Sequence, residues 1–365
     1  MKITCAIEKL QQAVILADRM TGKNLTLPTL HALLLTASGT TLKIRATNLT
    51  LGIDIEIPAN IAEEGTLLVK GDIIANVCSH LRGDKEVALA LENDNLTITT
   101  EHNTTVVKCL PNDEFPTLPT VEEEGFSIET KVLQEGIRSV YFAAAITEIK
   151  PEIASIFIYS EGDSLVFVAT DSFRLAEKKI KVKGIPEISK ILIPYKNIAD
   201  ILRVLDSAPE TMQLRYNRNQ LSLIGNGIYL TSRLIDGGFP QYQLIIPKEE
   251  LTKVVVLKAE LISTLRLSTL FADKFFQVLF SVIPQTKGIT ISSKNADVGS
   301  SVSTIDSVVQ GDEIAVECNL KYFIDVFQAL NGDSVSISFT KPNKPIVVKS
   351  VSDTSFLYLL MPTNR

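Results

Sequence analysis

Residues 195–205, YKNIADILRVL, return in outline at 71–81, GDIIANVCSHL, and at 320–330, LKYFIDVFQAL. In each stretch apolar residues stand at the i, i+3 and i+7 spacing of an amphipathic helix. The stretches align at separations of 124 and 125 residues, in the columns Ile74/Ile198/Phe323, Val77/Ile201/Val326 and Leu81/Leu205/Leu330. A period of this length exceeds the roughly 20 to 50 residues of solenoid repeats and suffices for a domain. The chain is therefore predicted to contain three similar domains.

A second set of matching positions precedes these stretches, at separations of 123 and 128 residues: Leu10/Leu133/Leu261 and Val14/Ile137/Leu265. It predicts a first helix in each copy, over roughly 7–20, 131–145 and 258–272. Short runs that alternate between apolar and polar residues are typical of half-buried antiparallel strands, and they lie at 41–45, 95–99, 213–216 and 334–338. Gly225-Asn226-Gly227 is interpreted as a hairpin turn.

These patterns indicate an α+β fold in which two helices of each domain pack on an antiparallel sheet. The predicted domains span residues 1–121, 126–247 and 248–365.

The composition is that of a soluble protein. Apolar residues make up 45% of the chain and charged residues 21%, and no apolar run reaches the roughly 18 to 20 residues that cross a bilayer. Charges at Lys2, Glu8 and Lys9 interrupt the stretch where a signal peptide would be continuously apolar. The four cysteines are scattered and form no C-x-x-C pair, so the sequence predicts neither a zinc site nor a disulfide framework.

The usual catalytic motifs are absent from the sequence. The three histidines form no H-E-x-x-H pattern, and neither a G-x-S-x-G elbow nor a phosphate loop occurs. Asp171 and Asp236 could be proposed as a catalytic pair of carboxylates. Nothing in the sequence, however, supplies the burial or the partner that would shift their pKa values. We therefore expect a protein that is not an enzyme and that needs neither a metal nor a cofactor.

The net charge of −6 argues against a general nucleic-acid coat but allows basic charge on one face. The predicted helical segments contain more basic than acidic side chains, whereas the rest of the chain is acidic. Ordinary solvated helix faces are the alternative explanation.

Several segments carry a family resemblance. They are VATDSFRLA at 168–176, DGGFPQY at 236–242 and LLMP at 359–362, with LPNDEFP at 110–116 and TLP at 26–28. Together with the threefold repeat they make the chain similar, over its whole length, to the beta subunit of bacterial DNA polymerase III, the family of processivity sliding clamps. The resemblance implies a head-to-tail homodimer that closes as a ring around double-stranded DNA. It also implies a cytoplasmic, nucleoid-associated protein that tethers the replicative polymerase without reading the DNA sequence.

The resemblance suggests which basic residues face DNA. Lys196 stands where the family places a DNA-contacting lysine, and Lys23 lies in the family's other contact loop. Arg138, Lys150 and Arg203 are further candidates. For each of them an ordinary solvated charge is the alternative. Phosphate contacts without base contacts suit a ring that slides.

The family's second site is an apolar pocket that captures short linear motifs from polymerases, clamp-loader and repair proteins. Its walls map onto Ile153, Thr170, Arg174, Leu175, Pro240, Ile245, Tyr322, Ile346, Leu359 and Met361, with Pro362 beside them. For Leu175 and Leu359 taken alone, an ordinary core position is the alternative. Ser172 and Phe173 stand where glycine and histidine are frequent, and Glu152 and Pro345 lie at the outer subsite. These departures leave the motif preference open.

The resemblance also places the dimer contact between the third domain of one subunit and the first domain of the other. Leu270, Phe271 and the edge strand near Val106 and Val107 are the candidates, because an unpaired strand edge can extend a sheet across an interface. One alternative function is a clamp-fold paralogue that recruits repair or regulatory factors. Another is a hydrolase or sugar-binding protein, for which the sequence offers no convergent polar site.

Overall fold

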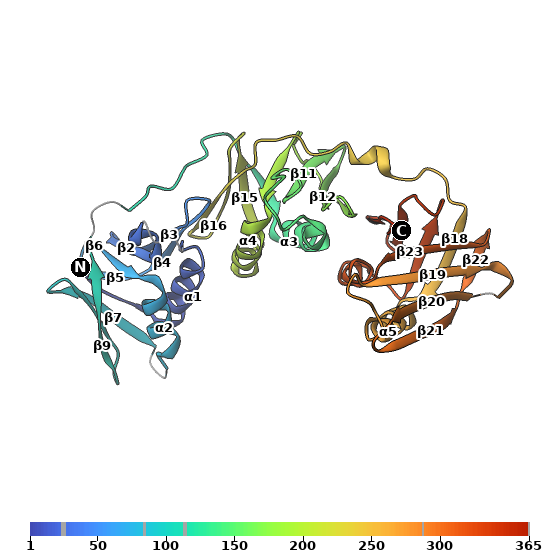
Figure 1. The fold of residues 1–365 in the computed structure, drawn as a ribbon. Helices are drawn as coiled ribbons and strands as arrows, with labels where there is room; N and C mark the ends of the chain where they lie inside the picture. The colour runs from blue at the N-terminus through green and yellow to red at the C-terminus, as the bar shows by residue number, and fades with distance from the viewer. Residues whose placement is uncertain (23–26, 83–84, 112–114, 287, 364–365) are drawn as a thin grey trace. The chain divides into compact units, whose positions relative to one another are not determined.

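The computed structural model describes residues 1–22, 27–82, 85–111, 115–286 and 288–363. Figure 1 traces the chain through these residues, which form two compact units. Unit 1 contains Met1–Gln134 and Lys196–Leu234, and unit 2 contains Glu135–Tyr195 and Ile235–Arg365. Both units combine antiparallel sheets with helices, which confirms the predicted α+β class.

Unit 1 contains a 13-stranded antiparallel sheet in the order β10-β15-β16-β17-β4-β3-β2-β6-β9-β8-β7-β1-β5. Its strands are β1 Lys2–Ala6, β2 Ala32–Ser38, β3 Thr41–Thr47, β4 Leu51–Pro58, β5 Asn60–Glu63, β6 Gly65–Lys70, β7 Glu86–Glu92, β8 Asn95–Thr99, β9 Thr104–Leu110, β10 Phe126–Glu129, β15 Thr211–Tyr216, β16 Gln220–Gly225 and β17 Ile228–Arg233. Strands β17 and β4 are paired, with Leu230 opposite Ile53. Strands of the predicted first and central domains therefore share one sheet.

Unit 2 contains a 9-stranded sheet, β14-β11-β12-β13-β26-β25-β24-β18-β22, and a 4-stranded sheet, β21-β20-β19-β23. The strands are β11 Ser155–Glu161, β12 Ser164–Thr170, β13 Arg174–Lys181, β14 Ile191–Pro194, β18 Thr252–Leu257, β19 Gln277–Ile283, β20 Gly288–Asn295, β21 Gly299–Asp306, β22 Val308–Gly311, β23 Ile314–Asn319, β24 Ser334–Phe339, β25 Ile346–Ser350 and β26 Phe356–Leu360. Here β13 pairs with β26, with Leu175 opposite Leu359.

The two compact units divide the strands of the predicted central domain, 126–247. Strands β15 to β17 join the sheet of the first predicted domain through β4, and β11 to β14 join strands of the third through β26. Backbone hydrogen bonds thus connect strands on either side of each predicted domain boundary. The compact units therefore have different limits from the predicted domains. The domain limits themselves stay a prediction.

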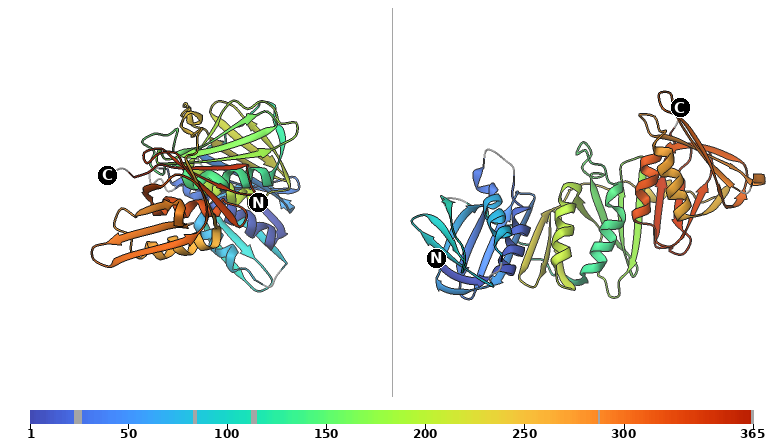
Figure 2. Two further views of the ribbon diagram at one scale, coloured as in Figure 1. Left: turned by 90° about the vertical axis from the view of Figure 1, so that its right-hand side faces the viewer. Right: turned by 90° about the horizontal axis from the view of Figure 1, so that it is seen from below.

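The helices fall where the repeat predicts them. They are α1 Ile7–Asp18, α2 Gly71–His80, α3 Thr130–Val140, α4 Tyr195–Ser207, α5 Lys258–Thr269 and α6 Leu320–Asp325, with 3₁₀ turns η1 Pro28–His31, η2 Tyr141–Ala143, η3 Tyr242–Ile245, η4 Pro284–Thr286 and η5 Val326–Gln328. Helix α1 lies beside α2, and α5 beside α6, and the right-hand view of Figure 2 shows both pairs. Helix α3 is shorter than predicted, because the chain tightens into η2 after Val140.

The repeated apolar columns lie in the core except at Val77, which is partly exposed. Ile74, Ile198 and Phe323 are all buried, which explains why these positions stay apolar in each copy. The predicted hairpin is confirmed: Asn226 and Gly227 both have positive φ, as a two-residue turn between β16 and β17 requires.

No helix in the described part of the chain is long and apolar enough to cross a membrane. Within the described residues, no group of three His, Cys, Asp or Glu side chains is arranged to hold a metal ion.

Candidate functional site

A small apolar cavity of about 150 Å³ lies in unit 2. Its walls come from the ends of β12, β13 and β26, from Ile153 before β11 and from the segment that includes η3. The lining residues are Ile153, Thr170, Ser172, Phe173, Arg174, Leu175, Pro240, Gln241, Tyr242, Ile245, Leu359 and Met361. Eight of the predicted walls are thus brought together from segments far apart in sequence.

The register of two strands determines which side chains reach the cavity. Leu175 on β13 lies opposite Leu359 on β26, and both belong to a buried apolar cluster with Val166, Val168 and Tyr242. Residues that lie directly opposite each other on paired strands point to the same face of the sheet. Leu175 and Leu359 therefore share one face and form the floor of the cavity. They are core residues and wall residues at once.

The loop that joins β12 to β13 is tightly held. The Thr170 hydroxyl donates to the Arg174 carbonyl at 2.6 Å, and the Asp171 carboxylate accepts the backbone N–H groups of Phe173 and Arg174, both at 2.9 Å. Met361 N–H donates to the Phe173 carbonyl at 2.8 Å, which ties the loop to the end of β26. The rim of the cavity is therefore a fixed structure.

Arg174 is the charged residue among the lining side chains, and its guanidinium is enclosed. Its Nε lies 2.9 Å from Asp171 Oδ2, its Nη1 lies 2.5 Å from Asp325 Oδ2, and it stacks 4.4 Å from the centre of the Tyr322 ring. Burial lowers the pKa of Arg174, but the hydrogen bond to Asp325 and the nearby carboxylates outweigh burial and raise the pKa overall. Arg174 therefore stays charged and acts mainly to hold the wall in place.

Two predicted walls, Tyr322 and Ile346, and the adjacent Pro362 are not among the lining residues. Tyr322 on α6 contacts Arg174 from behind and is not itself a lining residue. Ile346 is 1% exposed, lies opposite Leu360 in the sheet and is not among the residues that line this cavity, so its part in the site stays a prediction. Pro362 follows Met361, is partly exposed and does not line the cavity.

Four lining residues were not predicted as walls: Ser172, Phe173, Gln241 and Tyr242. All four lie inside the sequence segments that carry the family resemblance. Those segments could therefore have been used to predict these four residues as walls. Tyr242 is buried; its hydroxyl donates to the Glu177 carboxylate and lies 2.9 Å from the Tyr159 hydroxyl oxygen. Burial, then the bond to Glu177, raises the pKa of Tyr242, so this phenol stays neutral.

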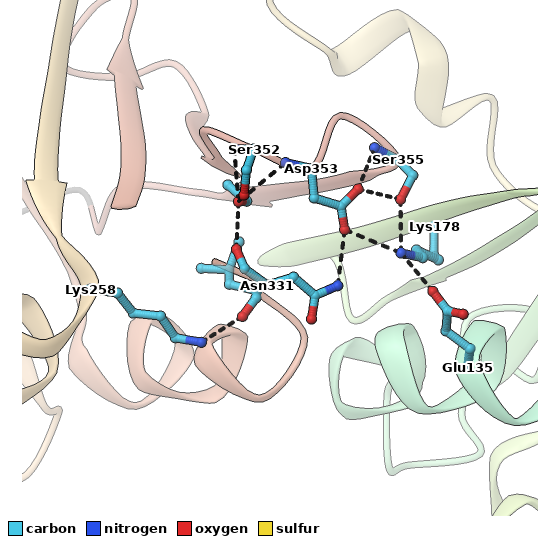
Figure 3. A network of polar contacts seen from close by, with 9 residues as sticks. Glu135, Lys178, Lys258, Asn331, Ser352, Asp353 and Ser355 are labelled. Carbon is cyan, nitrogen blue, oxygen red and sulfur yellow. Dashed lines mark hydrogen bonds and ion pairs between the residues drawn. The ribbon is translucent and has the colours of Figure 1, made fainter. Parts of the chain in front are cut away.

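A polar network holds β13 and β26 together at the end away from the cavity (Figure 3). Lys178 on β13 is 3% exposed, and its Nζ lies 2.8 Å from Ser355 Oγ, 2.9 Å from Glu135 Oε1 and 3.4 Å from Asp353 Oδ2. Asn331 also donates to Asp353, at 3.0 Å. Burial raises the pKa of Asp353, but hydrogen bonds from Ser355 and Asn331 and the charge of Lys178 outweigh it, and the pKa lies well below its usual range.

The predicted DNA-facing residues are exposed wherever the structure describes them. Lys196 and Arg203 lie on α4 in unit 1, with Arg203 Nη1 3.3 Å from Asp200. Arg138 lies on α3 and Lys150 in the turn before β11, both in unit 2. Lys23 lies outside the described residues.

The predicted dimer residues differ in exposure. Val106 on β9 is 61% exposed, whereas Val107 is 7% exposed, so of these two side chains only that of Val106 is exposed. Leu270 and Phe271 follow α5; Leu270 is exposed and Phe271 is partly exposed. Among the described strands, residues 104–108 of β9 pair only with β8, and β21 pairs only with β20. Both are therefore edges.

Comparisons with known proteins cover the whole chain. The three domain models of the DNA polymerase III beta subunit match: the N-terminal domain at residues 1–119, the central domain at 127–241 and the C-terminal domain at 243–364. A beta sliding clamp from Synechococcus elongatus is 26% identical over 370 residues, covering 99% of both chains. One from Staphylococcus aureus is 25% identical over 335 residues, covering 91% of this chain and 88% of the relative.

Solved structures agree with these sequence matches. The DNA polymerase III beta subunit of Thermotoga maritima superimposes with a TM-score of 0.94 at 27% identity, over 100% of this chain and 99% of that one. The DNA polymerase sliding clamp of Bacillus subtilis gives 0.93 at 25% identity with the same coverage.

Proposed function

This chain belongs to the family of the DNA polymerase III beta subunit, the beta sliding clamps, and on that premise we propose that two copies close head to tail around duplex DNA. The observation that carries the proposal is the succession of three domain matches along the chain. The proposed domains are 1–121, 126–247 and 248–365. A clamp holds DNA by topology, so its work needs no catalytic group.

The strand pairing supports the head-to-tail arrangement. Strands β4, β13 and β21 begin at residues 51, 174 and 299, and β9, β17 and β26 begin at 104, 228 and 356, so each set recurs at about the repeat separation. β4 pairs with β17, and β13 with β26. The remaining members, β21 and β9, have unpaired edges among the described strands. Pairing of β21 with β9 of a second copy repeats the same junction and closes a ring.

Sedimentation of the purified protein tests this assembly. A dimer at micromolar concentration is expected, because two copies of a threefold chain give six domains. A monomer at that concentration, or a trimer, contradicts the proposed ring.

The cavity at the ends of β13 and β26 is the proposed site for short linear motifs of the replicative polymerase, the clamp loader and repair proteins. Apolar walls with a few polar groups suit an extended peptide that buries one or two anchors. The test is the affinity of a peptide from the C-terminus of the organism's replicative polymerase. Tight binding supports a replicative clamp, and no binding favours a clamp-fold paralogue, for which Ser172 and Phe173 are the motivating departures.

The proposed DNA face comprises Lys23, Lys196, Arg203, Arg138 and Lys150. Such side chains contact phosphates without reading bases, which permits sliding. The proposed location is the cytoplasm, at the nucleoid.

A further inference from the structure

Phe173 is an aromatic residue that the fold presents to solvent. Its side chain is 60% exposed although it lines the cavity, whereas the neighbouring walls Leu175 and Leu359 are buried. An exposed apolar ring beside a concave apolar site gains free energy when a partner covers it.

The backbone holds this ring in place at a cost. Ser172 has a φ of +78°, a conformation that residues with a side chain rarely adopt and that stores strain. Hydrogen bonds on both sides of Phe173 maintain it: its N–H donates to Asp171, and its carbonyl accepts from Met361. The ring therefore sits on a rigid rim, so little ordering entropy is lost when a partner packs on it.

The charges around the rim discriminate against acidic partners. Arg174, the charged lining residue, already has its guanidinium enclosed by the carboxylates of Asp171 and Asp325. These three groups leave one net negative charge beside the cavity. An acidic side chain placed beside Asp171 and Asp325 would lose water and be repelled by these two carboxylates.

Building on the proposed function of the cavity, we propose that Phe173 determines motif specificity by packing on a second apolar side chain of the partner segment, next to the anchor that fills the cavity. The same rim excludes an acidic residue from that position. Partners of this clamp thus carry an apolar residue, and no Asp or Glu, beside the anchor.

The experiment uses fluorescein-labelled decapeptides with one aliphatic and one aromatic anchor residue. Phe, Ser or Asp is placed in turn at each of the two positions on either side of the anchor. Fluorescence anisotropy then measures affinity for the wild type, for Phe173→Ala, for Phe173→Leu and for Phe275→Ala. Phe275 is a matched control, because it is 61% exposed in the same unit but does not line the cavity.

At one flanking position, Phe is expected to bind the wild type roughly five- to tenfold more tightly than Ser. Phe173→Ala removes this preference, Phe173→Leu retains part of it, and Phe275→Ala leaves it unchanged. Asp is expected to bind more weakly than Ser, by a margin that shrinks as salt rises. Equal affinity for all flanking residues overturns the specificity proposal alone. Absence of binding by every peptide overturns the proposed function of the cavity as well.

Discussion

At the scale of single residues, the buried Lys178 is expected to contribute strongly to stability. Its ammonium group contacts Glu135, Asp353 and Ser355, and removal of one partner from a buried charged network leaves the others uncompensated. We expect Lys178→Met to lower the free energy of unfolding by about 3 kcal/mol, measured by urea titration with circular dichroism.

The adjacent Lys179 provides the control. Its Nζ pairs with the exposed Glu161 and lies 3.9 Å from Glu177, at the far limit of an ion pair. Pairs of exposed side chains contribute about 0 to 1 kcal/mol. Lys179→Met is therefore expected to change stability by less than about 1 kcal/mol. Equal losses for the two variants would show that the network in Figure 3 adds nothing beyond an exposed ion pair.

Residue types around the cavity could be predicted from sequence better than their orientation could. The family resemblance predicted eight of the lining residues. Tyr322 and Ile346 do not line the cavity, and residue type alone does not say how far a side chain reaches toward it. Neither the exposure of Phe173 nor the positive φ of Ser172 could be predicted from the residue types.

At the scale of elements, the hairpin between β16 and β17 helps to join two predicted domains. Gly227 has a φ of +75°, and a Cβ added there would lie 2.7 Å from the carbonyl oxygen of Glu56 on β4. Its own carbonyl accepts a hydrogen bond from Glu56 N–H at 2.8 Å. An added methyl group would therefore displace the backbone where β17 meets β4.

We expect Gly227→Ala to destabilise the protein by about 1 kcal/mol or more beyond the cost of positive φ alone. Gly162→Ala is the matched control, because Gly162 has a φ of +57° with no atom within 4 Å of an added Cβ. Thermal unfolding of both variants measures the difference. Identical shifts of the midpoint would mean that the contact with Glu56 is unimportant.

The unpaired edge of β9 gives the second prediction at this scale. Val106 is exposed on that edge, and lysine on an edge strand opposes further pairing. Val106→Lys is expected to weaken the dimer at least about tenfold, seen by sedimentation across a dilution series. Val351→Lys, at an exposed valine in the turn after β25, should leave the dimer intact. A Val106→Lys protein that stays as dimeric as the wild type excludes β9 from the interface.

Elements were predictable where the signal is local. The alternating runs predicted strands and the helical spacing of apolar residues predicted helices, because each of these patterns extends over only a few neighbouring residues. The pairing of β4 with β17 and of β13 with β26 joins residues more than a hundred positions apart. The alternation of apolar and polar residues predicts a strand but does not predict which other strand it pairs with. This is why the predicted domains and the compact units divide the chain differently.

At the scale of the whole molecule, the repeat and the acidic net charge support one mechanism. A protein of net charge −6 is poorly suited to coat DNA, but a ring with a few basic residues on its helices needs only weak phosphate contacts. Retention should then depend on the topology of the DNA and only slightly on salt.

The decisive measurement compares closed circular with linear DNA after loading by the clamp loader. A protein held by six to ten phosphate contacts loses roughly 10³- to 10⁵-fold in affinity between 50 and 200 mM salt. A closed ring cannot leave a circle without opening, so its lifetime there should stay long at both salt concentrations and be short on linear DNA. Lys196→Ala combined with Arg203→Ala should leave the lifetime on circles unchanged, because topology rather than charge holds the ring. Loss from circles as fast as from linear DNA would mean that charge holds this protein on DNA and that no ring forms.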